Sequence, residues 1–139
     1  MPDAGITTDM ITGFPGETEE DFNESYEFAK KMKLSKIHVF PFSPKKGTAA
    51  AGFPNQVGGN KKRERTEMLL KLSDMTGAEY LNGFTGKILN VLYETEKSGV
   101  YTGYSTNYIT VSTKSNQNLI NVIKPVKIAE IKGLTAVSE

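Results

Sequence analysis

Few side chains of this 139-residue sequence are suited to acid–base or metal chemistry. His38 is the single histidine, and there is no cysteine. The composition therefore excludes disulfides, thiolate zinc sites, His-rich metal sites and cysteine-held iron–sulfur clusters within the chain. A lone histidine on a strand is more often a packed residue than a catalytic group. We therefore expect no catalytic residue in this chain.

Side chains suited to binding are more frequent. A basic cluster comprises Lys61, Lys62, Arg63 and Arg65. Such a cluster can neutralise the phosphates of a nucleic acid, although charge clusters are often simply solvated. The net charge of the chain is only +1, so no global polycation indicates nucleic acid.

The tyrosines allow a second kind of contact. Four of the six lie in the second half, at Tyr93, Tyr101, Tyr104 and Tyr108. Some must fill the core of a small domain, and one or two could stack on unpaired bases. Lysines in the same half could supply the electrostatic attraction; they are Lys87, Lys114, Lys124 and Lys127.

The elements that position these residues can be read from the first half. Residues 6–13 are mostly β-branched or apolar and predict a strand that ends in a Phe-Pro-Gly turn. Thr18 and Asp21 have the spacing of a capping box and predict a helix whose apolar stripe comprises Phe22, Tyr26, Ala29 and Met32. Residues 36–42 predict a second strand, buried on both faces. Strand, helix and strand form a βαβ unit with parallel strands.

The sequence pattern changes along the remaining chain. Residues 43–60 predict a long loop, and residues 61–81 predict a helix with Leu72, Met75 and Tyr80 on its apolar side. Beyond it, five short β-rich runs predict a small barrel or sandwich. The fold class is therefore α/β plus all-β, with residues 1–82 and 83–139 as the two domains.

No apolar run approaches the roughly 20 residues of a membrane span, and no signal peptide is evident at the start. We therefore expect a cytoplasmic protein without membrane contact.

Residues 9–18, with the string Met10-Ile11-Thr12-Gly13-Phe14-Pro15-Gly16-Glu17-Thr18, are the most specific segment. Turn and capping rules explain its parts but not the whole string. It resembles the methylthiotransferase branch of the radical S-adenosylmethionine enzymes, in which a late barrel strand ends in this turn. Three further segments match that family in order: residues 38–50, residues 62–69 and residues 83–108.

The resemblance implies an architecture and an activity. Residues 1–82 resemble the last βαβα portion of a partial TIM-type barrel, and residues 83–139 resemble the TRAM domain, a small OB-like RNA-binding barrel. The family's enzymes add a methylthio group to a modified adenosine beside the tRNA anticodon, with S-adenosylmethionine and iron–sulfur clusters. The cluster cysteines, spaced Cys-x3-Cys-x2-Cys, would precede Met1. The chain alone is therefore predicted to be inactive, with the parent's N-terminal domains and the tRNA anticodon stem-loop as its partners.

The same resemblance assigns candidate site residues. Ile11, Gly13 and Phe40 would contact S-adenosylmethionine. Candidates for substrate or RNA contact are Glu17, His38, Ser43, Lys45, Lys46, Lys62, Arg63, Arg65, Lys87, Tyr101, Tyr104 and Tyr108. Several have an alternative: Gly13 as a turn glycine, Glu17 as a residue that favours the helix N-terminus, and Phe40 as core.

The segment His38-Val39-Phe40-Pro41-Phe42-Ser43 most resembles the enzymes that act on threonylcarbamoyladenosine tRNA. Relatives that act on isopentenyladenosine tRNA or on a ribosomal protein remain alternatives. A further alternative is a non-catalytic RNA-binding module, because the chain lacks cysteine but retains the whole TRAM-like region.

Overall fold

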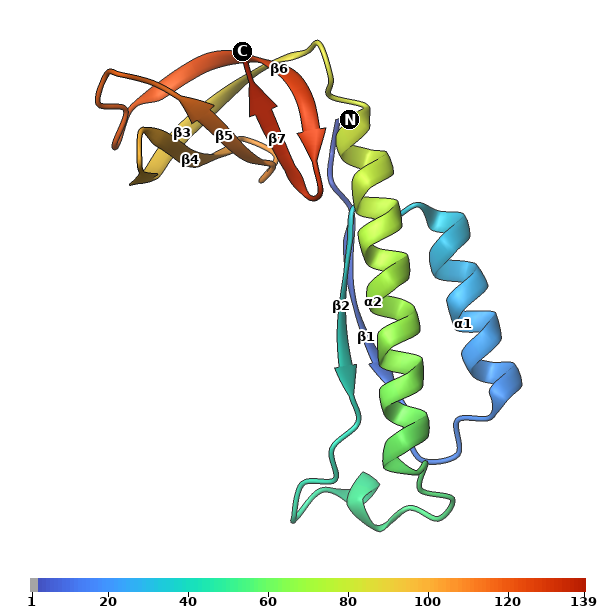
Figure 1. Ribbon diagram of the computed structural model, residues 1–139. Helices are drawn as coiled ribbons and strands as arrows, with labels where there is room; N and C mark the ends of the chain where they lie inside the picture. The colour runs from blue at the N-terminus through green and yellow to red at the C-terminus, as the bar shows by residue number, and fades with distance from the viewer. Residues whose placement is uncertain (1–2) are drawn as a thin grey trace. The chain divides into compact units, whose positions relative to one another are not determined.

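The computed structural model describes residues 3–139, which divide into two compact units. One unit comprises residues 6–76, and the other comprises residues 77–139 with the first few described residues. Figure 1 labels the elements in chain order. Within residues 3–139, no helix is long and apolar enough to cross a membrane.

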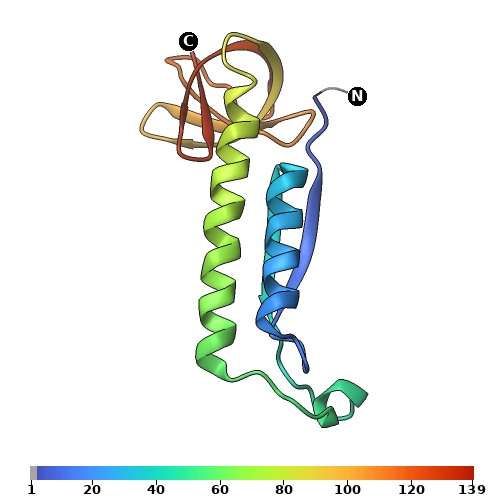
Figure 2. The same ribbon diagram turned by 90° about the vertical axis from the view of Figure 1, so that its right-hand side faces the viewer.

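The first unit is a parallel strand pair with helices. β1 (Thr7–Thr12) is followed by α1 (Glu19–Met32), β2 (Lys36–Pro41), a short 3₁₀ helix η1 (Ala49–Gly52) and α2 (Gly59–Asn82). β1 and β2 pair in parallel, with Thr7 opposite Lys36 and Thr12 opposite Pro41, which confirms the predicted βαβ unit. Figure 2 shows both helices running along the strand pair.

Local sequence determines where α1 begins. The Thr18 side chain accepts a hydrogen bond from the Asp21 backbone N–H, and the Asp21 carboxylate accepts one from the Thr18 N–H. This reciprocal pair confirms the predicted capping box. Lys33 adopts a left-handed conformation at φ 50° and ends the helix.

The core of this unit lies between the helices and one face of the strand pair. Its buried side chains are Phe22, Ala29, Leu34, Ile37, Leu69 and Leu72. Ser73 of α2 also accepts a hydrogen bond from the Ile37 backbone N–H at 2.9 Å, which fixes α2 against β2. Two predicted core positions were wrong: Met32 is 49% exposed and Met75 is 60% exposed, because the buried side of each helix is narrower than the predicted apolar stripe.

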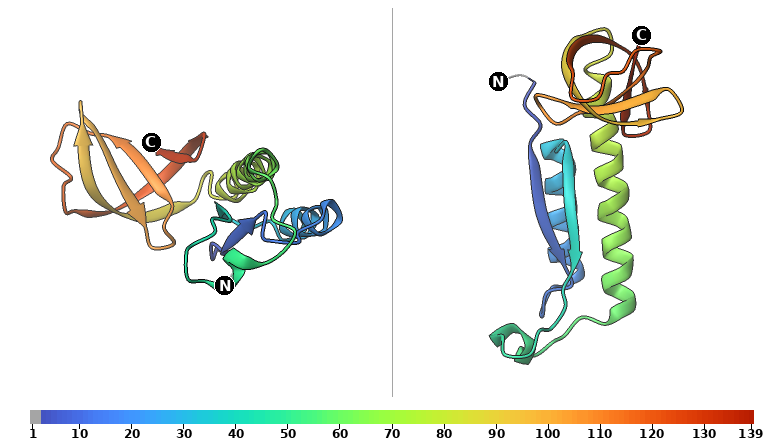
Figure 3. Two further views of the ribbon diagram at one scale, coloured as in Figure 1. Left: turned by 90° about the horizontal axis from the view of Figure 1, so that it is seen from below. Right: turned by 90° about the vertical axis from the view of Figure 1, so that its left-hand side faces the viewer.

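Within residues 3–139, no helix lies over the opposite face of the strand pair, as the right-hand view of Figure 3 shows. Ile11 is 57% exposed and Phe40 is 52% exposed on this face. The prediction that β2 is buried on both faces was therefore wrong for the chain as described: Ile37 is buried, whereas His38 and Phe40 are exposed.

The second unit contains a closed barrel of five strands. They are β3 (Ile88–Lys97), β4 (Val100–Ser105), β5 (Thr110–Lys114), β6 (Ile123–Lys132) and β7 (Thr135–Ser138). The order around the barrel is β3-β4-β5-β7-β6, and β6 pairs with β3 to close it. Only β5 and β7 pair in parallel among these strands. The predicted run of five short strands is thus confirmed, and closure removes the free edges of the sheet.

The barrel interior is filled by alternate residues of its strands. Val91, Tyr93, Val111, Ile128 and Ala136 are fully buried. The Tyr93 hydroxyl shares a hydrogen bond with the Thr113 hydroxyl, which in turn lies 2.7 Å from the Ser138 hydroxyl. The phenol is therefore satisfied inside the core, and burial raises the pKa of Tyr93 above its usual range.

Candidate ligand and nucleic-acid surfaces

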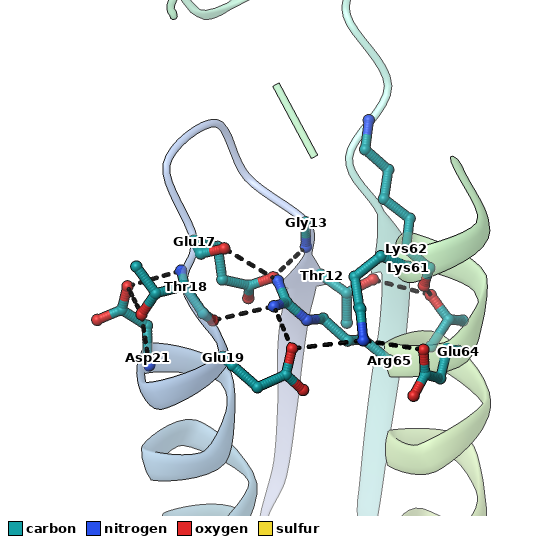
Figure 4. A network of polar contacts seen from close by, with 11 residues as sticks. Thr12, Gly13, Glu17, Thr18, Glu19, Asp21, Lys61, Lys62, Glu64 and Arg65 are labelled. Carbon is teal, nitrogen blue, oxygen red and sulfur yellow. Dashed lines mark hydrogen bonds and ion pairs between the residues drawn. The ribbon is translucent and has the colours of Figure 1, made fainter. Parts of the chain in front are cut away.

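The turn after β1 is held by a buried arginine. We call Arg65, Glu17, Glu19 and the backbone that they bind the Arg65 network (Figure 4). Arg65 Nη1 donates to Glu17 Oε2 at 2.6 Å, and Nη2 donates to Glu19 Oε2 at 3.2 Å. The guanidinium also donates to the backbone carbonyls of Glu17 and Thr18, at 3.1 and 3.0 Å. It therefore ties α2 to the chain that enters α1.

Glu17 connects this arginine to the end of the strand. Its Oε2 also accepts a hydrogen bond from the Gly13 backbone N–H at 2.6 Å. Gly13 has φ +70°, a conformation that glycine adopts without steric cost. A Cβ added there would collide with the Cγ of Lys62. Two contacts therefore account for the glycine and the glutamate of the string Gly13 to Glu17. The Gly13 N–H binds the Glu17 carboxylate, and α2 lies too close to Gly13 for a Cβ.

These contacts change the interpretation of the basic cluster. Arg65 is only 3% exposed, so it does not face solvent as expected for an RNA-binding residue. Its partners are two carboxylates and two carbonyls of its own chain, because the turn before α1 folds over it. Glu17 is likewise engaged, with a side chain 14% exposed.

The other cations of the cluster differ in how free they are. Lys62 is half-buried, and its Nζ donates to the Phe42 carbonyl at 3.0 Å and lies 5.2 Å from the centre of the Phe42 ring. Lys61 forms ion pairs with Glu19 and Glu64. Arg63 is exposed. Of the expected RNA contacts in this cluster, Arg63 is therefore the most accessible.

The carboxylates of Glu19, in the Arg65 network, and of Asp21, in the capping box, should make stability depend on pH. A hydrogen bond from Arg65 lowers the pKa of the Glu19 carboxyl, and the Thr18 backbone N–H lowers that of Asp21. A lowered folded-state pKa means that the ionised carboxyl stabilises the fold above its unfolded pKa of about 4, and that this contribution is lost as the pH falls. We expect the urea midpoint of residues 6–76 to fall on acidification below about pH 4.

The matched variants for this effect are Glu19→Gln and Asp21→Asn, which cannot ionise. Each should show a smaller loss of the urea midpoint between neutral and acidic pH than the parent chain. Glu24→Gln, at an exposed position of α1, serves as the control. An unchanged pH dependence in both test variants would contradict the proposed linkage.

The proposed cofactor residues lie on and beside the uncovered face of β1 and β2. Ile11 and Phe40 are direct register partners, as are Asp9 and His38. The two apolar side chains therefore form one exposed patch, with His38 exposed on the same strand. Gly13 is buried and lies just beyond the end of β1. The apolar patch is of the kind that an adenine ring can cover.

The loop after β2 carries the remaining candidates of this unit. Ser43, Lys45 and Lys46 are exposed. The Thr48 hydroxyl donates to the Lys45 carbonyl at 2.8 Å, and η1 follows directly. The predicted loop is thus partly ordered by local hydrogen bonds, and its two lysines remain accessible to an anionic partner.

The barrel separates the tyrosines into two groups. Tyr101 is 9% exposed and packs edge-to-face against Tyr93, with ring centres 6.5 Å apart. The expectation that Tyr101 contacts RNA does not fit this position, because its ring fills the core. Tyr104 and Tyr108 are 45% and 88% exposed. Lys87 is exposed but pairs with Asp3 at 2.7 Å and lies over the Phe84 ring.

Sequence reasoning missed two exposed aromatic residues near the strand ends. Phe14 and Phe53 are 43% and 44% exposed, and the ring of Phe14 packs against those of both Phe42 and Phe53. The available signal was an aromatic residue directly before proline in a glycine-containing turn, at Phe14-Pro15-Gly16 and Gly52-Phe53-Pro54. Within the described residues 3–139, no group of acidic or histidine side chains is suited to a metal ion.

Comparison with known proteins finds relatives of the chain. None of the family models searched matches the chain. The threonylcarbamoyladenosine tRNA methylthiotransferase MtaB of Bacillus subtilis is 41% identical over 92% of this chain and 30% of its own length. The tRNA-2-methylthio-N(6)-dimethylallyladenosine synthases of Thermoanaerobacter sp. and Aquifex aeolicus are 37% and 36% identical, over 100% and 92% of this chain and 30% and 29% of their own lengths.

The structure combines a parallel strand pair that packs against two helices with a closed β-barrel. Both parts expose apolar and basic side chains. Along nearly its whole length the chain is similar to tRNA methylthiotransferases, as the sequence motifs indicated. It spans about 30% of the length of these relatives.

Proposed function

We propose that the chain is the C-terminal portion of a tRNA methylthiotransferase that modifies threonylcarbamoyladenosine next to the anticodon. The observation that carries this proposal is the 41% identity to the Bacillus subtilis enzyme of that name, against 37% and 36% for two dimethylallyladenosine enzymes. The segment from His38 to Ser43 points to the same branch.

Within this proposal, residues 1–82 are the last portion of a radical S-adenosylmethionine barrel and residues 83–139 are a TRAM domain. The uncovered face of β1 and β2 supports the first assignment, because parallel sheets are normally covered on both faces. The strand order β3-β4-β5-β7-β6 supports the second, because a five-stranded closed barrel is the architecture of OB-like nucleic-acid-binding domains.

The residues of the uncovered face fit one of the two implied cofactors. Ile11 and Phe40 would cover the adenine of S-adenosylmethionine. Gly13 is left out of this contact, because it is buried and the side chain of Lys62 occupies the space where a Cβ would lie. When bound, S-adenosylmethionine supplies the radical that the reaction needs. An iron–sulfur cluster does not fit this chain, because it contains no cysteine. The contribution of these residues is to orient the cofactor and to exclude water from it.

The RNA contacts that we propose are restricted to accessible side chains. Tyr104 and Tyr108 would stack on unpaired bases of the anticodon loop, and Lys45, Lys46 and Arg63 would meet its phosphates. Arg65 and Tyr101 are left out because they are buried. Lys87 and Lys62 would contribute at most as partly paired charges. We place the parent enzyme in the cytoplasm, where its tRNA substrate is found.

The decisive experiment uses the full-length parent. It is incubated with tRNA that carries threonylcarbamoyladenosine, with tRNA that carries isopentenyladenosine and with ribosomal protein, and products are analysed by mass spectrometry. We expect the methylthio product on threonylcarbamoyladenosine alone. A product on either other substrate alone would refute the substrate assignment, and the isolated 139-residue chain serves as the inactive control.

A second candidate function is a non-catalytic RNA-binding module, favoured by the absence of cysteine together with a complete closed barrel. Filter binding of an anticodon stem-loop to the chain at two salt concentrations tests it. We expect affinity to fall with salt, because phosphate contacts release counterions. Binding that does not change with salt, or no binding, would count against this function.

A further inference from the structure

Three phenylalanines form a partly exposed aromatic cluster, defined as Phe14, Phe42 and Phe53. The Phe14 and Phe42 ring centres lie 5.2 Å apart at 71°, and those of Phe14 and Phe53 lie 6.2 Å apart at 81°. Both are edge-to-face contacts, which fix the rings relative to one another. Phe14 and Phe53 nevertheless remain 43% and 44% exposed. The cluster is therefore an ordered aromatic surface rather than part of the core.

Backbone hydrogen bonds hold the cluster at the carboxyl ends of β1 and β2. The Phe42 N–H donates to the Thr12 carbonyl at 2.8 Å, which continues the strand pairing. The Gly16 N–H donates to the Asn55 carbonyl at 2.9 Å, which joins the turn after Phe14 to the loop that carries Phe53. In sheets of parallel strands this end is where ligands bind. The cluster is thus preorganised in the position expected for a binding surface.

The segment that carries Phe42 and Phe53 is positively charged. From residue 28 to residue 63 there is no aspartate or glutamate. The basic residues between 36 and 63 are Lys36, Lys45, Lys46, Lys61, Lys62 and Arg63. Lys62 lies 5.2 Å from the centre of the Phe42 ring, so one cation borders the cluster directly. The surface therefore combines aromatic rings with an excess of positive charge.

We propose that the aromatic cluster is a stacking surface for an unpaired nucleobase of single-stranded RNA. Phe14 and Phe53 contact the base, and Lys45, Lys46 and Arg63 meet the adjoining phosphates. An aromatic surface within a cationic segment has the two properties that single-stranded nucleic acid recognises. An apolar protein partner would gain from the rings but would have to desolvate the lysines. This inference rests on the proposed RNA-binding function and names a site on residues 6–76 that is separate from the barrel tyrosines.

The absence of tryptophan from the sequence makes the test direct. Phe53→Trp gives the 139-residue chain a single indole reporter at the cluster. An unpaired oligouridine RNA and an anticodon stem-loop are titrated into it, and indole fluorescence is recorded. We expect quenching that saturates with the RNA. Phe28→Trp is the matched control, because Phe28 is 63% exposed on α1 and should show no quenching.

Affinity provides the second measurement. Phe53→Leu and Phe14→Leu keep an apolar side chain but remove the ring, and each should weaken RNA binding by about 5- to 140-fold, the range for loss of one stacked base. Phe28→Leu should leave affinity unchanged. Thermal melting followed by circular dichroism verifies that each variant is folded.

The outcomes separate the two proposals. Salt-sensitive RNA binding with no quenching and with unchanged affinity in both leucine variants would overturn the stacking surface but leave the RNA-binding function intact. No binding by the parent chain would overturn both. Self-association that Phe53→Leu abolishes, with RNA affinity unchanged, would assign the cluster to a protein contact and would also overturn the inference.

Discussion

Replacing Gly103 with alanine is expected to lower the free energy of unfolding of the barrel by about 3 kcal/mol, at the upper end of the range for overpacking. Gly103 lies on β4 opposite Tyr93, beside a register shift between Tyr93 and Thr95. A Cβ at this position would collide with the backbone carbonyl of Leu92 and approach the Cα of Tyr93. Because the obstacle is backbone rather than a flexible side chain, β3 and β4 must separate.

Urea unfolding followed by the near-ultraviolet tyrosine signal measures this effect. Five of the six tyrosines lie in residues 77–139, so the signal reports mainly on the barrel. Gly52→Ala is the control, because an added Cβ there would meet nothing within 4 Å. A Gly103→Ala midpoint equal to that of the parent would contradict the close approach of β3 and β4.

Replacing Arg65 with leucine is expected to destabilise residues 6–76 by about 3 kcal/mol, the lower end of the cost of removing one partner from a buried ion pair. The side chains of Arg65 and Glu17 are 4% and 14% exposed, so the Glu17 carboxylate would lose its cation with little access to water. The carbonyls of Glu17 and Thr18 would also lose their donor. Urea unfolding followed by the helical signal in the far ultraviolet measures the change.

Two further variants test this explanation. Arg63→Leu removes a neighbouring but exposed arginine and should change stability by no more than about 0.5 kcal/mol. The double variant Arg65→Leu with Glu17→Gln removes both charges and should recover part of the loss, because the stranded carboxylate is gone. Equal losses in Arg63→Leu and Arg65→Leu would mean that burial of the ion pair is not the cause.

Much of the fold followed from local patterns. The capping box at Thr18 and Asp21 predicted the start of α1, and the β-rich runs after residue 83 predicted five strands. The strand pattern left a barrel and a sandwich as alternatives, and a barrel was expected specifically only from the resemblance to the TRAM domain. The strand order was not predicted, because pairing depends on contacts between distant segments. The errors at Met32 and Met75 have the same origin: helical periodicity identifies a face, but the neighbouring element decides how wide the buried part is.

The candidate site was less predictable than the fold. Lys62, Arg63 and Arg65 look alike in sequence, yet one is half-buried, one is exposed and one is buried under the turn before α1. Tyr101 and Tyr104 lie three residues apart on one strand and differ in the same way. The aromatic cluster was missed because Phe14 and Phe53 are 39 positions apart in the sequence and meet only through the packing of two turns.

The sequence by itself determined the family resemblance, the order of the elements and the absence of cluster ligands, since motifs, capping and composition are local properties of the chain. Tertiary structure alone decided which cations and tyrosines are free to bind. Burial depends on what folds over a side chain, and for Arg65 the covering residues are Glu17, Thr18 and Glu19, almost 50 positions earlier. That is why one arginine of the basic cluster holds the turn before α1 while its neighbour at position 63 remains exposed to solvent.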